Sequence, residues 1–214
     1  FVSTKLWPSV YEAGDAAIEG TLNRLGLDYV DMLILHQPVG NYLAAWKTME
    51  KAYKEGKVRA LGLSNFPQEK IAEVIDHAEI KPQLVTVECH PYFAQSGLRE
   101  YLSQYGIVIE AWYPLGHGDK GLQGEPVFIK LAEKYGKTAA QVILRWHVQM
   151  GTSIIPGSKN PAHIADNADI FDFELTDEEM AEIAKLDGTK KYYEATEEAL
   201  AGYLAIKPDF DAQE

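Results

Sequence analysis

Short apolar runs alternate along this chain with longer segments in which apolar residues recur every three or four positions. The runs are predicted to be strands, at residues 1–4, 32–35, 60–64, 84–87, 108–111 and 152–155. Nearly continuous apolar runs of this length are typical of parallel strands that are covered on both faces. The longer segments are predicted to be helices, at residues 11–25, 42–54, 68–78, 97–105, 138–150 and 160–171. The pattern therefore predicts six consecutive βα units.

Local signals mark several helix ends. Thr138 with Gln141, and Thr176 with Glu179, have the spacing of a capping box at a helix start. Gly26, Gly56 and Gly106 follow helical patterns, where a left-handed cap is expected. The long gap between the last two strands holds a glycine-rich stretch, predicted to be a mobile loop, and an extra helix at 126–135.

Six βα units in series fit either a doubly wound sheet or most of a (β/α)₈ barrel. A barrel needs eight units in about 250 residues, so roughly two units would be absent from this chain. The sequence begins at Phe1, inside a strand pattern, and we therefore expect a chain that is incomplete at its N-terminus. No linker or low-complexity tract divides residues 1–214, so we expect a single domain.

The charge balance narrows the choice of partners. The chain has 20 Lys and Arg residues against 32 Asp and Glu residues, a formal net charge of −12. That balance argues against nucleic acid or an anionic membrane as a partner. A single cysteine, Cys89, excludes an internal disulfide and favours a reducing, cytoplasmic location. No apolar run reaches the length of a membrane span, and no signal peptide opens the sequence.

Polar or aromatic residues follow most of the predicted strands. They are Lys5, His36, Ser64 with Asn65, Glu88 with His90, Trp112, and Ser158. Taken singly, each has a structural explanation, such as a strand-end lysine, a buried histidine, a helix cap or a core aromatic residue. Glu88, Cys89 and His90 look like metal ligands, but neighbours on a strand point to opposite faces, so no metal site is predicted.

Taken together, these residues would meet at one rim of a parallel sheet, where ligands bind. A neutral histidine can donate a hydrogen bond to a carbonyl oxygen as negative charge develops on it. A serine and an asparagine can bind a carboxamide, and an indole can stack on a flat ring. Lys159 and the helix start that follows it favour an anion such as phosphate. The set predicts a nicotinamide nucleotide with a carbonyl substrate between its ring, His36 and Lys5.

The order and spacing of five motifs carry a resemblance to a known family. They are STKLW at 3–7, LDYVD at 27–31 with HQP at 36–38, GKVRALGLSNF at 56–66, ECHPY at 88–92, and IPGS at 155–158. The likeness extends through FDFEL at 171–175. In these motifs the chain resembles the aldo-keto reductases.

The resemblance implies an α/β fold, a (β/α)₈ TIM barrel of the aldo-keto reductase type, with about six of its eight units present. Members reduce aldehydes and ketones with NADPH, using an Asp-Tyr-Lys-His tetrad. By match, Lys5 and His36 are the tetrad lysine and histidine. The other matched positions imply cofactor contacts: Ser64 and Asn65 for the carboxamide, Trp112 for stacking, Leu115, and Ser158, Lys159, Asn160, Asp166 and Asn167 for the adenosine end.

Several departures from the family pattern alter these expectations. The tetrad Asp and Tyr precede the lysine motif in the family and are absent here, so the chain as given is predicted to be inactive. Thr86 stands where a carboxamide-binding Gln is usual. Gly157 and His163 stand where Lys and Arg often grip the 2′-phosphate. NADP(H) is therefore favoured, with NAD(H) left open.

The sequence leaves two other hypotheses about function open. One is a reductase-like barrel that binds nucleotide without catalysis. The other is a barrel glycoside hydrolase that uses Glu88 and Glu110, since two carboxylates about 5 Å apart suit retaining chemistry. In the favoured reading the partner is a small carbonyl substrate and the protein is a monomer.

Overall fold

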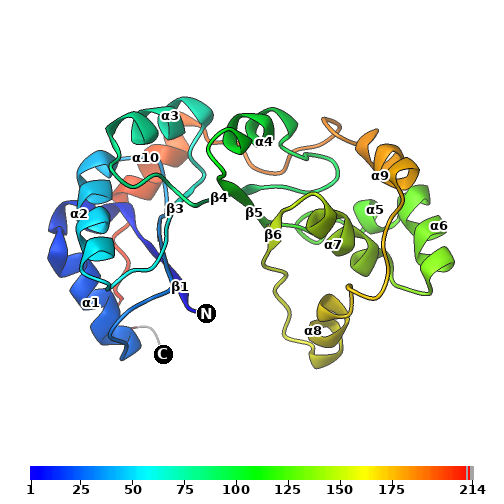
Figure 1. Cartoon of the computed structure of the whole chain (residues 1–214), viewed down its shortest axis with the longest axis horizontal. Coiled ribbons are helices and arrows are strands. Elements are labelled where there is room, and N and C mark those ends of the chain that lie inside the picture. The colour runs from blue at the N-terminus through cyan, green and yellow to red at the C-terminus, as the bar shows by residue number, and fades with distance from the viewer. Residues whose placement is uncertain (211, 213–214) are drawn as a thin grey trace. The chain divides into compact units, whose positions relative to one another are not determined.

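The computed structural model describes residues 1–210 and 212. The chain divides into two compact units (Figure 1). The first unit contains Phe1–Thr86 and the described residues from Ala195 onwards, and the second contains Val87–Glu194. The six strands are β1 (Ser3–Leu6), β2 (Met32–Leu35), β3 (Leu61–Ser64), β4 (Leu84–Glu88), β5 (Val108–Trp112) and β6 (Ser153–Ile154).

Parallel pairing in chain order builds the sheet of the first unit. β1 pairs with β2, β2 with β3, and β3 with the start of β4. The helices of this unit are α1 (Asp15–Leu25), α2 (Tyr42–Lys54), α3 (Gln68–His77) and α10 (Glu197–Ala205), and a 3-10 helix covers Pro8–Ala13.

Alternation along the strands gives the sheet of the first unit two different faces. Leu33, Leu35, Leu61 and Leu63 are fully buried, as are helix residues such as Trp46 of α2. The opposite face carries a small cluster of Met32, Ile34 and Leu84 with Ala60 beside it. Gly62 lies on this second face, where an added Cβ would meet Ile34 Cγ1 at 3.1 Å and Leu84 O at 3.2 Å. The lack of a side chain therefore lets the strands crowd together there.

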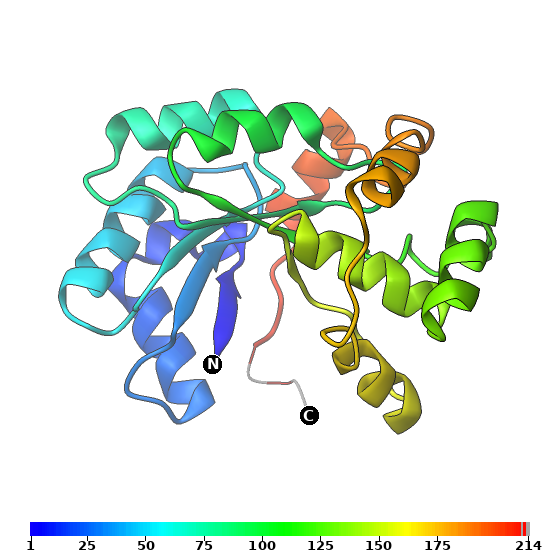
Figure 2. The ribbon, with the colours of Figure 1, turned by 45° about the vertical axis from the view of Figure 1, so that its right-hand side comes forward.

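The second unit contains the pair of β5 and β6 and most of the helices. Its helices are α4 (Ser96–Ser103), α5 (Lys120–Gln123), α6 (Pro126–Tyr135), α7 (Ala139–Gln149), α8 (Pro161–Ala168) and α9 (Asp177–Ala184). α6 and α7 pack against each other (Figure 2), and their apolar faces form a core around Phe128, Leu131, Val142 and Trp146. The capping boxes predicted for α7 and α9 are both present.

The expected elements are found, with local corrections. The predicted helix 11–25 is broken at Gly14, which has φ 57° and separates the 3-10 helix from α1. β1 begins two residues later than expected, so Lys5 lies inside the strand rather than beyond its end. The loop predicted over 116–124 contains α5, and helix 160–171 shortens to α8. The sequence pattern did not predict α10.

Gly26, Gly56 and Gly106 all have positive φ, as their place after helices predicted. The organisation into one domain stays a prediction. No helix in the described part of the chain has the length and apolar character needed to cross a membrane.

Candidate functional site

The register of the first sheet brings three of the predicted site residues to one face. Lys5 pairs with Ile34, Ile34 pairs with Gly62, and Ser64 pairs with Thr86. Residues two apart on a strand share a face, and so do partners in a parallel pair. His36, two residues after Ile34, therefore follows the same face as Lys5, Ser64 and Thr86. Alternating strand geometry thus places an imidazole and two hydroxyls beyond the Ile34 cluster, on the face that also carries Lys5.

His36 is held at the end of β2. Its backbone N–H donates to the carbonyl of Leu6 at 3.0 Å, and its ring lies 4.8 Å from the ring of Trp7. Burial and, to a lesser extent, the nearby charge of Lys5 lower the pKa of His36 to about 4. The imidazole is therefore neutral at pH 7. A neutral imidazole can donate one hydrogen bond without carrying charge into the site.

A pocket of about 600 Å³ lies beside Lys5 in the first unit. Its walls include Trp7, Thr21, Arg24 and Phe210. The guanidinium of Arg24 lies over the ring of Phe210, 5.1 Å from its centre. The Lys5 side chain is thus half-buried at a pocket wall rather than fully solvated.

Asn65 follows β3 in a left-handed conformation, with φ 61°. Its backbone N–H donates to Thr86 O at 2.9 Å, which fixes the peptide after Ser64. Asparagine tolerates this region better than other residues with a side chain. The position is therefore built around a residue that accepts the turn and still presents a carboxamide.

This conformation makes a matched pair of substitutions informative. Asn65→Ala should lower the free energy of unfolding by about 1–2 kcal/mol, since alanine is strained at positive φ. Asn65→Gly should cost less, because glycine adopts this φ without strain. Urea unfolding of the two variants would check this order. Equal losses would mean that the side chain, and not the backbone, sets the requirement.

Trp112 ends β5 and is flanked by two tyrosine rings of the second unit. Tyr113 lies edge-on at 4.5 Å and Tyr193 edge-on at 5.5 Å. Tyr113 has φ 56° and stacks on His117, with ring centres 3.9 Å apart. An indole that is only partly buried among such rings offers a platform for a flat ligand.

Hydrogen bonds at Pro114 and at Asp119 fix the loop 113–119 that follows Trp112. His147 of α7 lies below it, fully buried, and its Nε2–H donates to Pro114 O at 3.1 Å. Burial lowers the pKa of His147 to about 3, so it is neutral. Asp119 accepts hydrogen bonds from Tyr192 Oη at 2.8 Å and from Lys190, which lower the pKa of its carboxyl to about 2.

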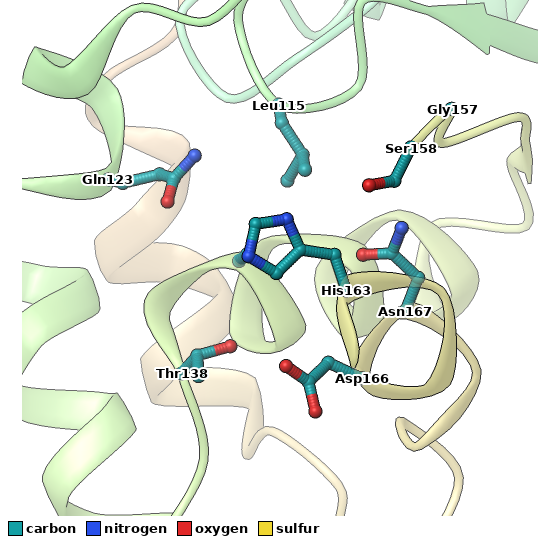
Figure 3. A pocket seen from close by; sticks show the side chains of 9 residues that line it. Leu115, Gln123, Thr138, Gly157, Ser158, His163, Asp166 and Asn167 are labelled. Carbon is teal, nitrogen blue, oxygen red and sulfur yellow. The ribbon is translucent and has the colours of Figure 1, made fainter. Parts of the chain in front are cut away.

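The loop also forms one wall of a pocket of about 250 Å³ in the second unit (Figure 3). The pocket is lined by Leu115, Gln123, Thr138, Ala140, Gly157, Ser158, His163, Asp166 and Asn167. Figure 3 shows the His163 ring in the middle of this set, with Ser158 and Asn167 close to each other on one side and Asp166 and Thr138 below. Three residues expected at the adenosine end of a nucleotide therefore line a single pocket, Ser158, Asp166 and Asn167, together with Leu115, which is expected to contact the cofactor.

The other two residues expected there are used differently. Asn160 caps α8, since its side chain accepts from Ala162 N at 3.0 Å, and its own N–H donates to Ser158 Oγ at 3.1 Å. Lys159 is exposed and is not among the residues that line the pocket. The hydrogen bond from Asn160 N–H helps to fix the position of the Ser158 hydroxyl.

A second, shallower hollow of about 280 Å³ lies next to this pocket in sequence and in space. It is lined by residues of the loop 113–119 and by Ile155, Pro156 and Gly157. Leu115 and Gly157 line both hollows. The loop therefore runs over a continuous surface that suits an extended ligand.

The pair Glu88 and Glu110 does not form a hydrolase site. The carboxylate of Glu88 is almost fully buried and accepts hydrogen bonds from His90 Nε2 at 2.9 Å, Tyr192 N at 2.6 Å and Tyr193 N at 2.8 Å. Glu110 is also buried, with Ser153 Oγ 3.5 Å from its Oε2. A buried carboxylate whose two oxygens both accept hydrogen bonds within the protein is poorly placed to attack a sugar, so this geometry disfavours the alternative.

Cys89 points away from its two neighbours, as strand alternation predicts. Its sulfur lies 3.7 Å from Ala94 O and 3.9 Å from the guanidinium of Arg99. Burial raises the pKa of the Cys89 thiol to about 12, so the thiol stays protonated. Cys89 is a core residue and not a reactive one.

Sequence reasoning missed the groups that hold this region from a distance. Tyr192, Tyr193 and Asp119 carried no local motif, and His147 looked like one more helix residue. Glu88 and Tyr192 are 104 positions apart, so no periodicity could pair them.

Comparison with known proteins identifies the family of this chain. The model of the aldo/keto reductase family matches residues 1–188. An aldo-keto reductase of Mycobacterium sp. (strain KMS) is 42% identical over 196 residues, which are 89% of this chain and 70% of that protein. A glyoxal reductase of Bacillus subtilis (strain 168) is 45% identical over 190 residues, 87% of this chain and 68% of that protein.

Solved structures give the same result for the fold. An aldo-keto reductase of Bombyx mori, in complex with NADP, has a TM-score of 0.84 at 31% identity, over 91% of this chain and 70% of that one. An aldo/keto reductase from Brucella melitensis has a TM-score of 0.82 at 39% identity, over 87% of this chain and 73% of that one. The fold is the (β/α)₈ barrel type, with about six of the eight βα units in this chain. The chain belongs to the aldo/keto reductase family.

Proposed function

We propose that this chain carries the cofactor-binding and carbonyl-orienting part of an NAD(P)H-dependent reductase of aldehydes and ketones. The single observation that carries the proposal is the shared face of Lys5, His36 and Ser64, which the strand register fixes. Relatives named glyoxal reductase and methylglyoxal reductase favour small carbonyl compounds as substrates.

His36 is proposed to hold the substrate carbonyl oxygen. Its burial keeps the ring neutral, so it donates a hydrogen bond to the oxygen as negative charge develops there. Lys5 is proposed to tune the acid that delivers the proton, since a nearby cation lowers the pKa of a phenol. A nicotinamide cofactor, when bound, supplies the hydride.

In the first unit, Ser64 and Asn65 are proposed to bind the carboxamide of the cofactor. In the second unit, Trp112 is proposed to stack on a flat ring of the cofactor. Leu115, Ser158, Asp166 and Asn167 would hold the adenosine end in the pocket of Figure 3, with Lys159 and Asn160 near the start of α8. The pocket fits this part of a nucleotide because hydroxyl, amide and imidazole groups converge there on an apolar wall.

NADP(H) is the proposed cofactor, with NAD(H) as the second choice. The neighbour solved in complex with NADP supports the first. The carboxylate of Asp166 beside His163 supports the second, because a carboxylate suits a ribose diol better than a phosphate. Titration with NADPH and NADH, followed by tryptophan fluorescence, tests both. No binding of either nucleotide would sink the proposal.

Trp112→Ala should weaken NADPH binding about three- to tenfold, the range expected for loss of one aromatic stack. Trp112→Phe keeps a ring and should lose less. Fluorescence titration or calorimetry would measure both. If both variants bind like the original chain, Trp112 is not the stacking platform.

The chain alone is proposed to be catalytically deficient. In the described part of the first unit, Tyr11 Oη is bonded to Gln37 and Tyr42 Oη to Glu73, and the pKa of both phenols is raised by burial. Neither is poised to give a proton beside Lys5. A reductase-like protein that binds nucleotide without turnover is therefore the second candidate, and the same engaged tyrosines favour it.

A further inference from the structure

The segment 188–193, between α9 and α10, has no helix or strand of its own, yet it is bound closely to the end of β4. Gly188 N–H donates to Tyr92 O at 2.9 Å. The consecutive N–H groups of Tyr192 and Tyr193 donate to the two oxygens of Glu88, at 2.6 and 2.8 Å. One carboxylate therefore fixes the direction of two successive peptides.

Glu88 is an unusual anchor because its side chain is 3% exposed. Burial opposes ionisation of this carboxyl, but the hydrogen bonds from His90 and from the two peptide N–H groups outweigh that effect and hold its pKa below its usual range. An ionised carboxylate with three donors is satisfied even away from water. The arrangement is specific, since both oxygens are used.

The anchored peptides place two rings against the proposed cofactor surface. The Tyr193 ring meets Trp112 edge-on at 5.5 Å, with an angle of 77° between the planes. The Tyr192 hydroxyl donates to Asp119 at 2.8 Å, at the far end of the loop 113–119. Both contacts begin at the same pair of peptides that Glu88 holds.

We infer that Glu88 is a positioning residue: through segment 188–193 it sets the orientation of Trp112 and ties down the loop 113–119. It touches neither cofactor nor substrate. The inference rests on the proposed function, in that Trp112 and this loop are taken to face the nicotinamide nucleotide. Without the anchor, Tyr193 would no longer limit the turning of the indole, and Asp119 would lose the hydroxyl that restrains its loop.

Glu88→Gln tests the anchor with little change in side-chain size. The glutamine oxygen can accept from one of the two peptide N–H groups, but its NH₂ group then faces the other N–H and cannot accept from it. Hydrogen exchange of the Tyr192 and Tyr193 amides should become about tenfold faster or more, as expected when a charge-assisted bond is lost. The ¹⁹F resonance of fluorotryptophan at position 112, assigned with Trp112→Phe, should shift. The resonance of Trp146, in the core of the same unit, should stay in place and report an intact fold.

A second variant separates positioning from folding. Tyr193→Leu keeps the peptide N–H groups on Glu88 but removes the ring beside Trp112. It should shift the Trp112 resonance while leaving the Tyr192 amide protected. Both variants should weaken NADPH binding about two- to fivefold, less than the loss of the Trp112 ring itself, whereas the control Glu125→Gln, which removes only the charged acceptor of the Tyr92 hydroxyl, should not.

An unchanged Trp112 resonance in both variants, or unchanged NADPH affinity in both, overturns the inference. Failure of the original chain to bind any nicotinamide nucleotide overturns the proposed function instead. In that case the exchange and ¹⁹F signals, which need no cofactor, still show whether Glu88 orients the ring.

Discussion

Mixed with NADPH and glyoxal, the 214-residue chain is expected to oxidise the cofactor about 10² to 10⁴ times more slowly than the Bacillus subtilis glyoxal reductase assayed beside it. Hydride transfer to a carbonyl leaves an alkoxide, so the transition state needs a proton donor within hydrogen-bond reach. His36 can orient the oxygen, but Tyr11 and Tyr42 are engaged with Gln37 and Glu73. The expected deficit has the size that a missing general acid typically produces.

Two variants of the same chain sharpen this result. Lys5→Met should leave the residual rate nearly unchanged, since under the proposed function no phenol in the described part of the first unit is poised beside Lys5. His36→Ala should lower the residual rate, since orientation of the carbonyl is lost. NADPH binding, measured on each sample, shows that a slow chain is still folded and loaded. A rate within about tenfold of the Bacillus enzyme would contradict the expectation, and so would a large loss on Lys5→Met.

Acid should destabilise the protein through His147 before most carboxylates titrate. Burial lowers the pKa of His147 to about 3, from the ordinary histidine value of 6.5. The unfolded chain therefore binds a proton between pH 6.5 and pH 3 that the folded chain does not. The contribution of His147 to the free energy of unfolding is fully present above pH 6.5. It should fall by about 1.4 kcal/mol for each pH unit below that.

The window between pH 6.5 and 4.5 reports on the buried histidines, because the carboxyl of Glu88, whose pKa is lowered, loses its contribution only at lower pH. Over these two units the expected loss from His147 is about 2.7 kcal/mol. His36, whose pKa is lowered to about 4, should add a loss of the same sign. Urea unfolding at several pH values measures the sum.

His147→Gln is the matched control, since a glutamine amide can still donate to Pro114 O but does not titrate. This variant should lose the part of the pH dependence of the free energy of unfolding that comes from His147. The part that comes from His36 should remain. A pH dependence identical in the original chain and in His147→Gln would show that His147 is protonated in the folded protein.

Sequence patterns alone predicted the βα order and the two capping boxes, and they identified the residues that carry the family motifs. These depend on contacts within about four positions or on alternation along one strand, and both leave a periodic trace. Alternation also predicted that Glu88 and Cys89 point to opposite faces, which their hydrogen bonds confirm.

The contacts of several of those residues became visible only in the tertiary structure. Glu88 changed from a candidate nucleophile to an anchor because Tyr192 and Tyr193, more than 100 positions away, bind both of its oxygens. His147 supports the Pro114 loop across 33 positions, and the Asn160 side chain caps α8. Such contacts join segments whose separation along the chain follows no period. They exist only once strand pairing and helix packing have brought those segments together, and burial then sets whether each group is charged.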